Sequence, residues 1–150
     1  ILVELQALAS STSFGTPRRT ILGLDPNRVA LLAAVMEKQL GMHLMGYDIF
    51  MNVAGGVRVV EPAVDMAIVS AIASSFLDKP IAPATVVLGE VGLTGEVRAI
   101  GQIDTRVAEV KKMGFKRCLV PVGNMKRIRN LDGIQITGIK TVSEAVESLF

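Results

Sequence analysis

Side chains that could act as nucleophiles or metal ligands are few in this sequence. His43 is its single histidine and Cys118 its single cysteine. His43 follows Gly41 after an expected helix and lacks partner ligands, so we expect a surface or boundary residue rather than part of a metal site. Cys118 lies in an apolar segment, which predicts an unreactive core residue. One cysteine also excludes an intramolecular disulfide and a cysteine-rich zinc site.

Three serines could in principle supply a nucleophile. Ser70, Ser74 and Ser75 lie in residues 66–77, an apolar stretch without charge. A stretch of this length and composition predicts a buried helix. We therefore expect these serines to be packing and surface residues of that helix, and a nucleophile among them would still need its own oxyanion site.

Phosphate-binding signatures are weak. The sequence has no Gly-x-x-x-x-Gly-Lys-[Ser/Thr] loop, so we do not expect this chain to hydrolyse ATP. Gly55-Gly56 could cradle a phosphate, but no helix begins after them at the required spacing. A strand bulge or a turn is the favoured interpretation.

The basic residues are the remaining candidates for a binding role. The net charge of +2 does not by itself argue for nucleic acid. Local clusters could contact the phosphates of DNA, or they could be solvated surface or form ion pairs between subunits. Lys111 and Lys112 end a predicted helix, where cations suit the helix dipole, so we expect them to be structural. No aromatic residues interleave with the clusters, so stacking on single-stranded bases is not supported. The DNA-binding candidates are Arg18, Arg19, Arg58, Lys126, Arg127 and Arg129.

The elements that must position these residues follow from the hydrophobic pattern. Asp25-Pro26 opens a helix that Gly41 ends, and Thr141 opens another with a capping-box spacing. Further helices are predicted at 63–77 and 103–113. Residues 10–24 are predicted to be a turn region, and 90–91 and 97–98 a hairpin. Other strands are predicted at 1–9, 47–53, 57–60, 85–88, 116–121 and 134–137. The mixture predicts one α+β domain over residues 1–150, a mixed α/β sandwich with a mixed sheet.

Composition limits the class of protein. Half of the residues are hydrophobic but only 4% are aromatic, so the core must consist of aliphatic side chains and methionine. No apolar segment is long enough to span a membrane, and we expect no signal peptide, because Glu4 interrupts the apolar start and no basic segment precedes it. The lone cysteine suits a reducing cytoplasm. The abrupt start without an initiator methionine suggests a fragment of a longer protein.

Residues 89–101 resemble the Gly-Glu-x-x-Leu-x-Gly-x-Val-x-x-Ile-Gly block of Lon proteolytic domains, and residues 114–121 resemble the stretch that follows it. The resemblance implies the Lon proteolytic-domain fold, which is like domain 2 of ribosomal protein S5. Four further segments are similar to the C-terminal domain of the bacterial RadA (Sms) family of DNA-repair proteins. These segments are residues 13–20, 27–32, 52–57 and 78–80.

Lon-type proteases use a Ser-Lys dyad, in which a lysine takes the proton of the nucleophilic serine. The resemblance places Ala63 at the serine position, in Pro62-Ala63-Val64-Asp65 where Lon domains have Pro-Ser-Ala-Gly. It places Asp104 at the lysine position. Neither residue can do the required chemistry, and Arg106 nearby is a poor base because it stays protonated. No catalytic residue is therefore expected, although residual peptidase activity and a peptide- or small-molecule-binding cleft are alternatives.

The resemblance also implies further domains, cofactors and partners. RadA/Sms proteins carry an N-terminal zinc finger and a RecA-like ATPase, so ATP, magnesium and zinc are expected in the missing part of a longer protein rather than in this chain. The family acts in branch migration of recombination intermediates. The resemblance implies a hexameric ring, contact with branched or single-stranded DNA and a recombinase as partner, in the bacterial cytoplasm and without a membrane.

Overall fold

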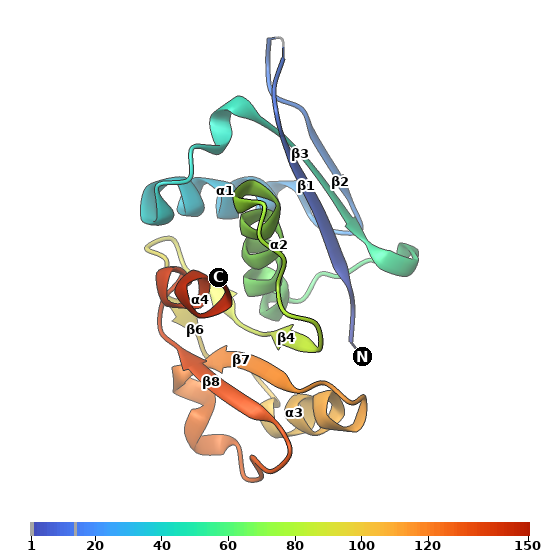
Figure 1. Ribbon diagram of the computed structural model, residues 1–150, viewed down its shortest axis with the longest axis vertical. Helices are drawn as coiled ribbons and strands as arrows, with labels where there is room; N and C mark the ends of the chain where they lie inside the picture. The colour runs from blue at the N-terminus through green and yellow to red at the C-terminus, as the bar shows by residue number, and fades with distance from the viewer. Residues whose placement is uncertain (1, 14) are drawn as a thin grey trace.

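Two three-stranded sheets and a short hairpin contain all the strands of the computed structural model, which describes residues 2–13 and 15–150 (Figure 1). In the first sheet β3 (Tyr47–Val53) lies at the centre, antiparallel to β1 (Leu5–Ser11) and parallel to β2 (Arg19–Leu22). In the second sheet β7 (Arg117–Pro121) is central and parallel to both of its neighbours, β4 (Thr85–Val87) and β8 (Gln135–Ile139). The hairpin pairs β5 (Glu90–Val91) with β6 (Val97–Arg98).

Capping residues mark where α1 (Pro26–Leu40) begins and ends and where α4 (Val142–Leu149) begins. α1 begins at Asp25, whose carboxylate accepts a hydrogen bond from the Asn27 amide, and ends at Gly41 with a φ of 65°. α4 begins at Thr141, whose hydroxyl accepts from the Glu144 amide. α2 (Asp65–Leu77) continues a 3-10 turn at Pro62–Val64, and α3 (Ile103–Lys112) has Lys111 and Lys112 in its last turn.

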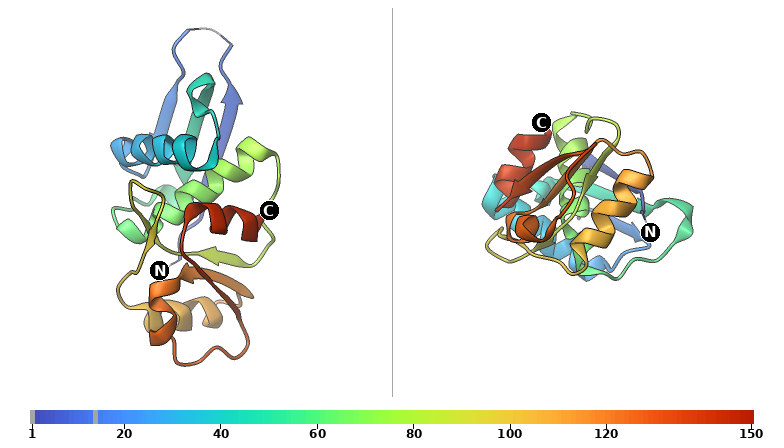
Figure 2. Two further views of the ribbon diagram at one scale, coloured as in Figure 1. Left: turned by 90° about the vertical axis from the view of Figure 1, so that its left-hand side faces the viewer. Right: turned by 90° about the horizontal axis from the view of Figure 1, so that it is seen from below.

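The hydrophobic core is divided by β7. Successive side chains of a strand point to opposite faces, so Leu119 packs with the larger cluster while Cys118 and Val120 pack with the smaller one. The larger cluster joins α1, α2 and α4 to the first sheet, and the smaller one packs α3 against the second. Figure 2 shows α3 and α4 on opposite sides of the second sheet. We call residues 99–140 the α3 lobe and the rest of the chain the main lobe.

Two segments differ from the sequence prediction. Residues 10–24 were predicted to be a turn region, but they hold the end of β1 and all of β2. Residues 57–60 were predicted to be a strand and form none. β3 already has a neighbour on each edge, so these residues have no free partner there, and the Val59 amide bonds only to the Gly23 carbonyl, at 2.8 Å.

The remaining elements follow the prediction with shifted ends, and the mixture of helices and sheets confirms the α+β class. The strands form two sheets rather than one, of which the first is mixed. Ile1, in the first predicted strand, and Phe14, in one of the segments that carry the resemblance, lie outside the described residues. Within the described part of the chain, no helix has both the length and the apolar character to cross a membrane.

Candidate functional site

Ala63 is buried in the 3-10 turn that precedes α2. Its carbonyl accepts a hydrogen bond from the Gly89 amide at 3.1 Å, and the Met66 amide donates to the Gly89 carbonyl at 3.0 Å. Two backbone bonds therefore fix this turn to the end of β4. Ala63 lines a pocket of about 300 Å³ whose walls are mainly valine and leucine. The residue that the resemblance places at the nucleophile position thus lines an apolar hollow, and its methyl side chain brings no reactive atom to it.

Asp104 faces a different hollow. It lies in the first turn of α3, where its carboxylate accepts from the Arg129 amide at 3.1 Å and lies 3.8 Å from the Arg129 Nε. The hollow beside it, of about 460 Å³, is lined by Lys111 and Arg129 and does not include Ala63. A carboxylate at a helix N-terminus suits the helix dipole. The Asp104 carboxylate is therefore bound to Arg129 within the chain. Ala63 and Asp104, which the resemblance places at the dyad positions, line different pockets.

Arg106 is the charged α3 residue that does line the pocket of Ala63. Its Nε donates to the Gly101 carbonyl at 2.8 Å, and its Nη2 forms an ion pair with Glu61. A guanidinium remains protonated at any physiological pH, so it cannot serve as a general base. The Glu61–Arg106 pair instead joins the main lobe to the α3 lobe beside this pocket.

The three serine hydroxyls of α2 are all hydrogen-bonded to backbone groups. Ser70 donates to the Met66 carbonyl and Ser74 to the Lys79 carbonyl, each at 2.6 Å. Ser75 Oγ accepts from the Ala9 amide at 2.9 Å, which connects α2 to β1. None of these bonds joins a serine to a base, which a hydroxyl nucleophile requires.

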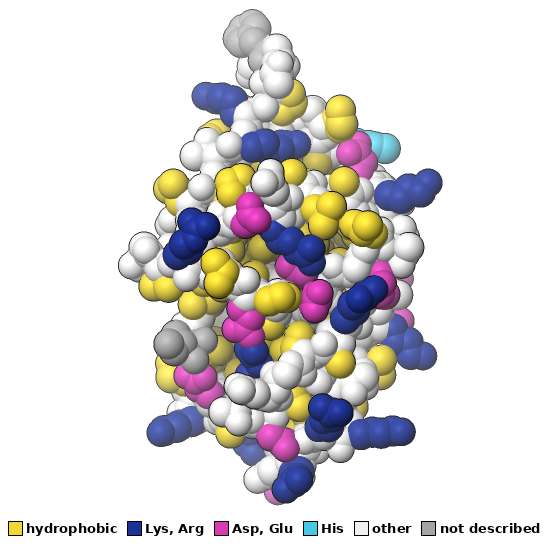
Figure 3. Space-filling view, turned by 180° about the vertical axis from the view of Figure 1, so that it is seen from behind, with side chains coloured by type: hydrophobic (Ala, Val, Ile, Leu, Met, Phe, Trp, Pro, Cys, Tyr) yellow, Lys and Arg dark blue, Asp and Glu magenta, His cyan; other side chains and the backbone are white. Residues whose placement is uncertain are grey.

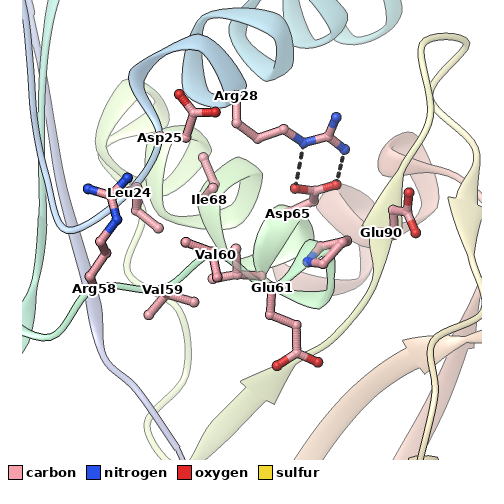
Figure 4. A pocket seen from close by; sticks show the side chains of 12 residues that line it. Leu24, Asp25, Arg28, Arg58, Val59, Val60, Glu61, Asp65, Ile68 and Glu90 are labelled. Carbon is pink, nitrogen blue, oxygen red and sulfur yellow. Dashed lines mark hydrogen bonds and ion pairs between the residues drawn. The ribbon is translucent and has the colours of Figure 1, made fainter.

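An ion pair that the sequence analysis missed lies on the other side of the 57–61 segment, in a pocket of about 280 Å³ (Figure 4). Asp65 is fully buried and accepts from Arg28 Nε at 2.9 Å, from Arg28 Nη2 and from the Val91 amide at 2.9 Å. Arg28 Nη2 also donates to the Val91 carbonyl at 3.0 Å. The hydrogen bond to Asp65 raises the pKa of Arg28 above its usual range. Asp65 is the only charged residue between positions 62 and 77, which is the sequence signal that could have identified it.

Arg18 and Arg19 hold the beginning of β2 in place. The buried Asp48 accepts from the Arg18 amide at 2.7 Å and from the Arg18 guanidinium at 3.2 Å. The Arg18 amide is the main cause of a lowered pKa for the Asp48 carboxyl. Arg19 donates to the carbonyls of Leu44 and Tyr47. Both guanidinium groups are therefore engaged within the chain, although the Arg18 side chain is 73% exposed.

The other basic candidates are separated from this pair. Arg58 is exposed on the segment between the two pockets. Lys126, Arg127 and Arg129 lie in the α3 lobe, at the end of the molecule opposite the loop that connects β1 and β2 (Figure 1). The structure therefore does not bring the six candidates into one surface.

Charge is distributed unevenly between the lobes. The α3 lobe contains nine of the 16 lysines and arginines but only three of the 14 acidic residues. On the face drawn in Figure 3, several Lys and Arg side chains project from the lower end of the molecule, which this lobe forms. Lys111 Nζ reaches the Asn130 carbonyl at 3.4 Å, so the end of α3 and the segment with Arg129 lie side by side. The lobe thus presents an excess of positive charge that the whole-chain net charge conceals.

No group of histidine, cysteine, aspartate and glutamate side chains that could hold a metal occurs in the part of the chain that the structure describes. His43 is 84% exposed, with Glu37 at 3.8 Å. Cys118 is fully buried, and burial raises the pKa of its thiol to about 12. A thiol with such a pKa is not a nucleophile near neutral pH.

Residues 33–150 match the model of the Lon protease (S16) C-terminal proteolytic domain. The chain is 52% identical over 148 residues to DNA repair protein RadA of Bacillus subtilis, which covers 99% of this chain and 32% of that protein. It is 43% identical over 147 residues to DNA repair protein RadA of Listeria monocytogenes, covering 98% of this chain and again 32% of the relative. The chain therefore spans about a third of the length of these curated relatives.

Proposed function

We propose, because this chain belongs to the Lon protease (S16) C-terminal proteolytic domain family, that it is the Lon-like domain of a RadA-type DNA-repair protein and acts as a non-catalytic scaffold. In this role it assembles into a hexameric ring and contacts DNA. Its similarity over nearly its whole length to proteins named DNA repair protein RadA supports the assignment to that context.

The absence of catalysis rests on Ala63. A methyl group stands where a Lon peptidase needs a hydroxyl, and a methyl group has neither a lone pair nor an exchangeable proton. Asp104, at the position of the lysine base, does not restore catalysis, because it lines another hollow and accepts a hydrogen bond from the Arg129 amide. The cheapest test is cleavage of casein or of a fluorogenic peptide. We expect no cleavage above a blank, and cleavage that disappears when one of the α2 serines becomes alanine would overturn this part of the proposal.

The charge of the α3 lobe supports contact with DNA. Proteins bind DNA largely by neutralising its phosphates, and an excess of exposed lysine and arginine on one lobe is the electrostatic footprint of such binding. Lys126, Arg127 and Arg129 are the most direct candidates because they lie together at the end of this lobe. Arg18 and Arg19 are weaker candidates, since Asp48 and backbone carbonyls already engage their guanidinium groups.

The rest of this proposal concerns the part of the longer protein that lies outside this chain. The zinc finger and the RecA-like ATPase, with zinc, ATP and magnesium, belong there, as does coupling to a recombinase in the bacterial cytoplasm. In this arrangement the Lon-like domain holds the ATPase modules in register around DNA.

The solution mass tests the scaffold. Light scattering on a sizing column, with and without duplex DNA, is expected to give six times the 16.0 kDa of one chain. A DNA-dependent shift that weakens with salt is expected in addition. A monomer that ignores DNA would overturn the proposal that this chain assembles and binds DNA by itself.

A further inference from the structure

The turn of the β5–β6 hairpin presents a large apolar side chain to solvent. Leu93 is 66% exposed at its tip. The turn beneath it is closed by hydrogen bonds from the Gly92 amide to the Glu96 carbonyl, at 2.9 Å, and from the Gly95 amide to the Gly92 carbonyl, at 3.0 Å. Glu96 adds bonds to Thr94 and an ion pair with Arg98 at 3.0 Å.

The base of the hairpin is equally well held. The Val97 amide donates to the Lys140 carbonyl at 2.8 Å, and the Val142 amide donates to the Gly95 carbonyl at 2.9 Å. An exposed leucine on such a restrained turn loses little conformational entropy when it binds a partner. Burying this side chain in an apolar groove of a partner would remove apolar surface from water, which is favourable.

A groove of suitable chemistry lies on the outer face of the first sheet. It has a volume of about 330 Å³ and no charged residue lines it. Leu8 and Leu22, exposed by 55% and 59%, flank it, and Phe50 forms its floor opposite Leu8 in the strand register. Residues of α1 and α2 fill the opposite face of this sheet with the larger core cluster. On the outer face, the Arg18 guanidinium lies 5.7 Å from the centre of the Phe50 ring, while Leu8 and Leu22 stay exposed to solvent in the described part of the chain.

The hairpin and the groove occupy opposite sides of the molecule. In Figure 1 the hairpin lies on the left, below α1, and the first sheet lies on the right. Two complementary patches on opposite sides generate a head-to-tail contact between copies, and such contacts close into rings when the rotation fits. A contact between two identical patches would instead give only a dimer.

The charges beside the two patches are opposite in sign. The hairpin carries two carboxylates, Glu90 and Glu96, against one guanidinium, Arg98. The beginning of β2 beside the groove carries two guanidinium groups, Arg19 and the preceding Arg18, against the single carboxylate of Asp48. The hairpin of a second copy of this chain therefore offers the groove both an apolar side chain, Leu93, and a charge of the opposite sign.

We propose that Leu93 of one copy inserts into the groove between Leu8 and Leu22 of the next, so that the hairpin and the first sheet form the head-to-tail contact of the ring. This inference rests on the assembly proposed above and assigns its two surfaces. It leaves the basic surface of the α3 lobe free for DNA.

The test uses two single variants, Leu93→Asp and Leu22→Asp, with Met113→Asp as a control because Met113 is similarly exposed (61%) but lies at the end of α3. Light scattering should give the mass of one chain for each of the first two variants and the wild-type mass for the control. Circular dichroism melts exclude unfolding as the cause. An equimolar mixture of the two variants should give twice the mass of one chain, since a single intact contact remains between them.

The outcomes distinguish failure of the proposed ring from failure of the proposed contact. Wild-type protein that is monomeric would overturn the ring itself and this contact with it. Wild-type protein that assembles, with both variants still assembled, would overturn the contact and leave the ring standing. Loss of assembly in Leu22→Asp alone would indicate that sheet faces pair with each other, which contradicts the head-to-tail arrangement.

Discussion

Arg28 and Asp65 form a two-pronged ion pair that joins α1 to the first turn of α2, and both residues also bond the backbone of Val91. Three separate elements therefore meet at a single fully buried carboxylate. Burying a carboxylate without a partner is costly, so each residue depends on the other.

Asp65→Ala should lower the free energy of unfolding by about 3–5 kcal/mol, because it leaves a guanidinium partly buried without its partner. Urea denaturation followed by circular dichroism measures this. Asp132→Ala, which removes an exposed carboxylate, should change stability by less than about 0.5 kcal/mol. In a double-mutant cycle, Arg28→Met should recover part of the stability in the Asp65→Ala background, and purely additive effects would contradict the coupling.

Stability should fall at acid pH in a way that depends on Glu96. Bonds from Thr94, the Glu96 amide and Arg98 lower the pKa of Glu96 from 4.5 to about 2. A carboxyl with a lowered folded-state pKa stabilises the fold fully above its unfolded pKa, and this contribution is lost as the pH falls from about 4.5 to about 2. Thermal melts of Glu96→Gln should therefore show a flatter decline over that range than the wild type. Identical slopes would show that Glu96 titrates normally.

Cys118 should not react with thiol reagents while the chain is folded. Burial raises its pKa to about 12, and only the thiolate attacks such reagents. With Ellman's reagent at about pH 8, near the ordinary pKa of a free thiol, we expect one thiol per chain in urea and none without it. A Met113→Cys variant, which places a thiol at an exposed position, should react at once under native conditions. Rapid labelling of the folded wild type would contradict the burial of Cys118.

Replacing Lys126, Arg127 and Arg129 together by glutamine should weaken DNA binding for every sequence tested. The dependence of the logarithm of affinity on the logarithm of salt concentration should become shallower by about 0.9 for each phosphate that the variant no longer neutralises. Fluorescence anisotropy at several salt concentrations measures this slope. The paired variant Lys38→Gln/Lys79→Gln removes charge from the main lobe and should leave the slope unchanged. Equal effects of both sets would place the DNA surface elsewhere.

The sequence predicted those elements whose signals are local. Asp25 and Pro26 are sufficient to start α1, and Thr141 to start α4, because a cap satisfies backbone groups within a few residues of itself. β2 was missed because it has only four residues between the turn residues Pro17 and Gly23, and its partner β3 lies far along the chain. Residues 57–60 have a strand-like composition, but composition does not show whether a segment pairs with a sheet, and the bond from the Val59 amide to the Gly23 carbonyl is not extended into a ladder.

The candidate site, too, could be predicted from the sequence only in part. Ala63 and Asp104 were located by alignment to a motif, which needs no knowledge of three-dimensional structure. That they line separate hollows, and that Arg106 lines the hollow of Ala63, depends on how α3 packs against the second sheet. The uneven charge likewise gains meaning only once the structure shows that residues 99–140 lie together at one end of the molecule.

The Arg28–Asp65 pair also bears on which residues positions 28 and 65 can hold. In the resemblance to the Pro-Ser-Ala-Gly segment, Asp65 stands at the glycine position, and a glycine there would leave Arg28 without its carboxylate. Such a change in α2 is therefore expected to need a compensating change at Arg28 in α1. The two positions are epistatic, since the effect of a substitution at either one depends on the residue at the other.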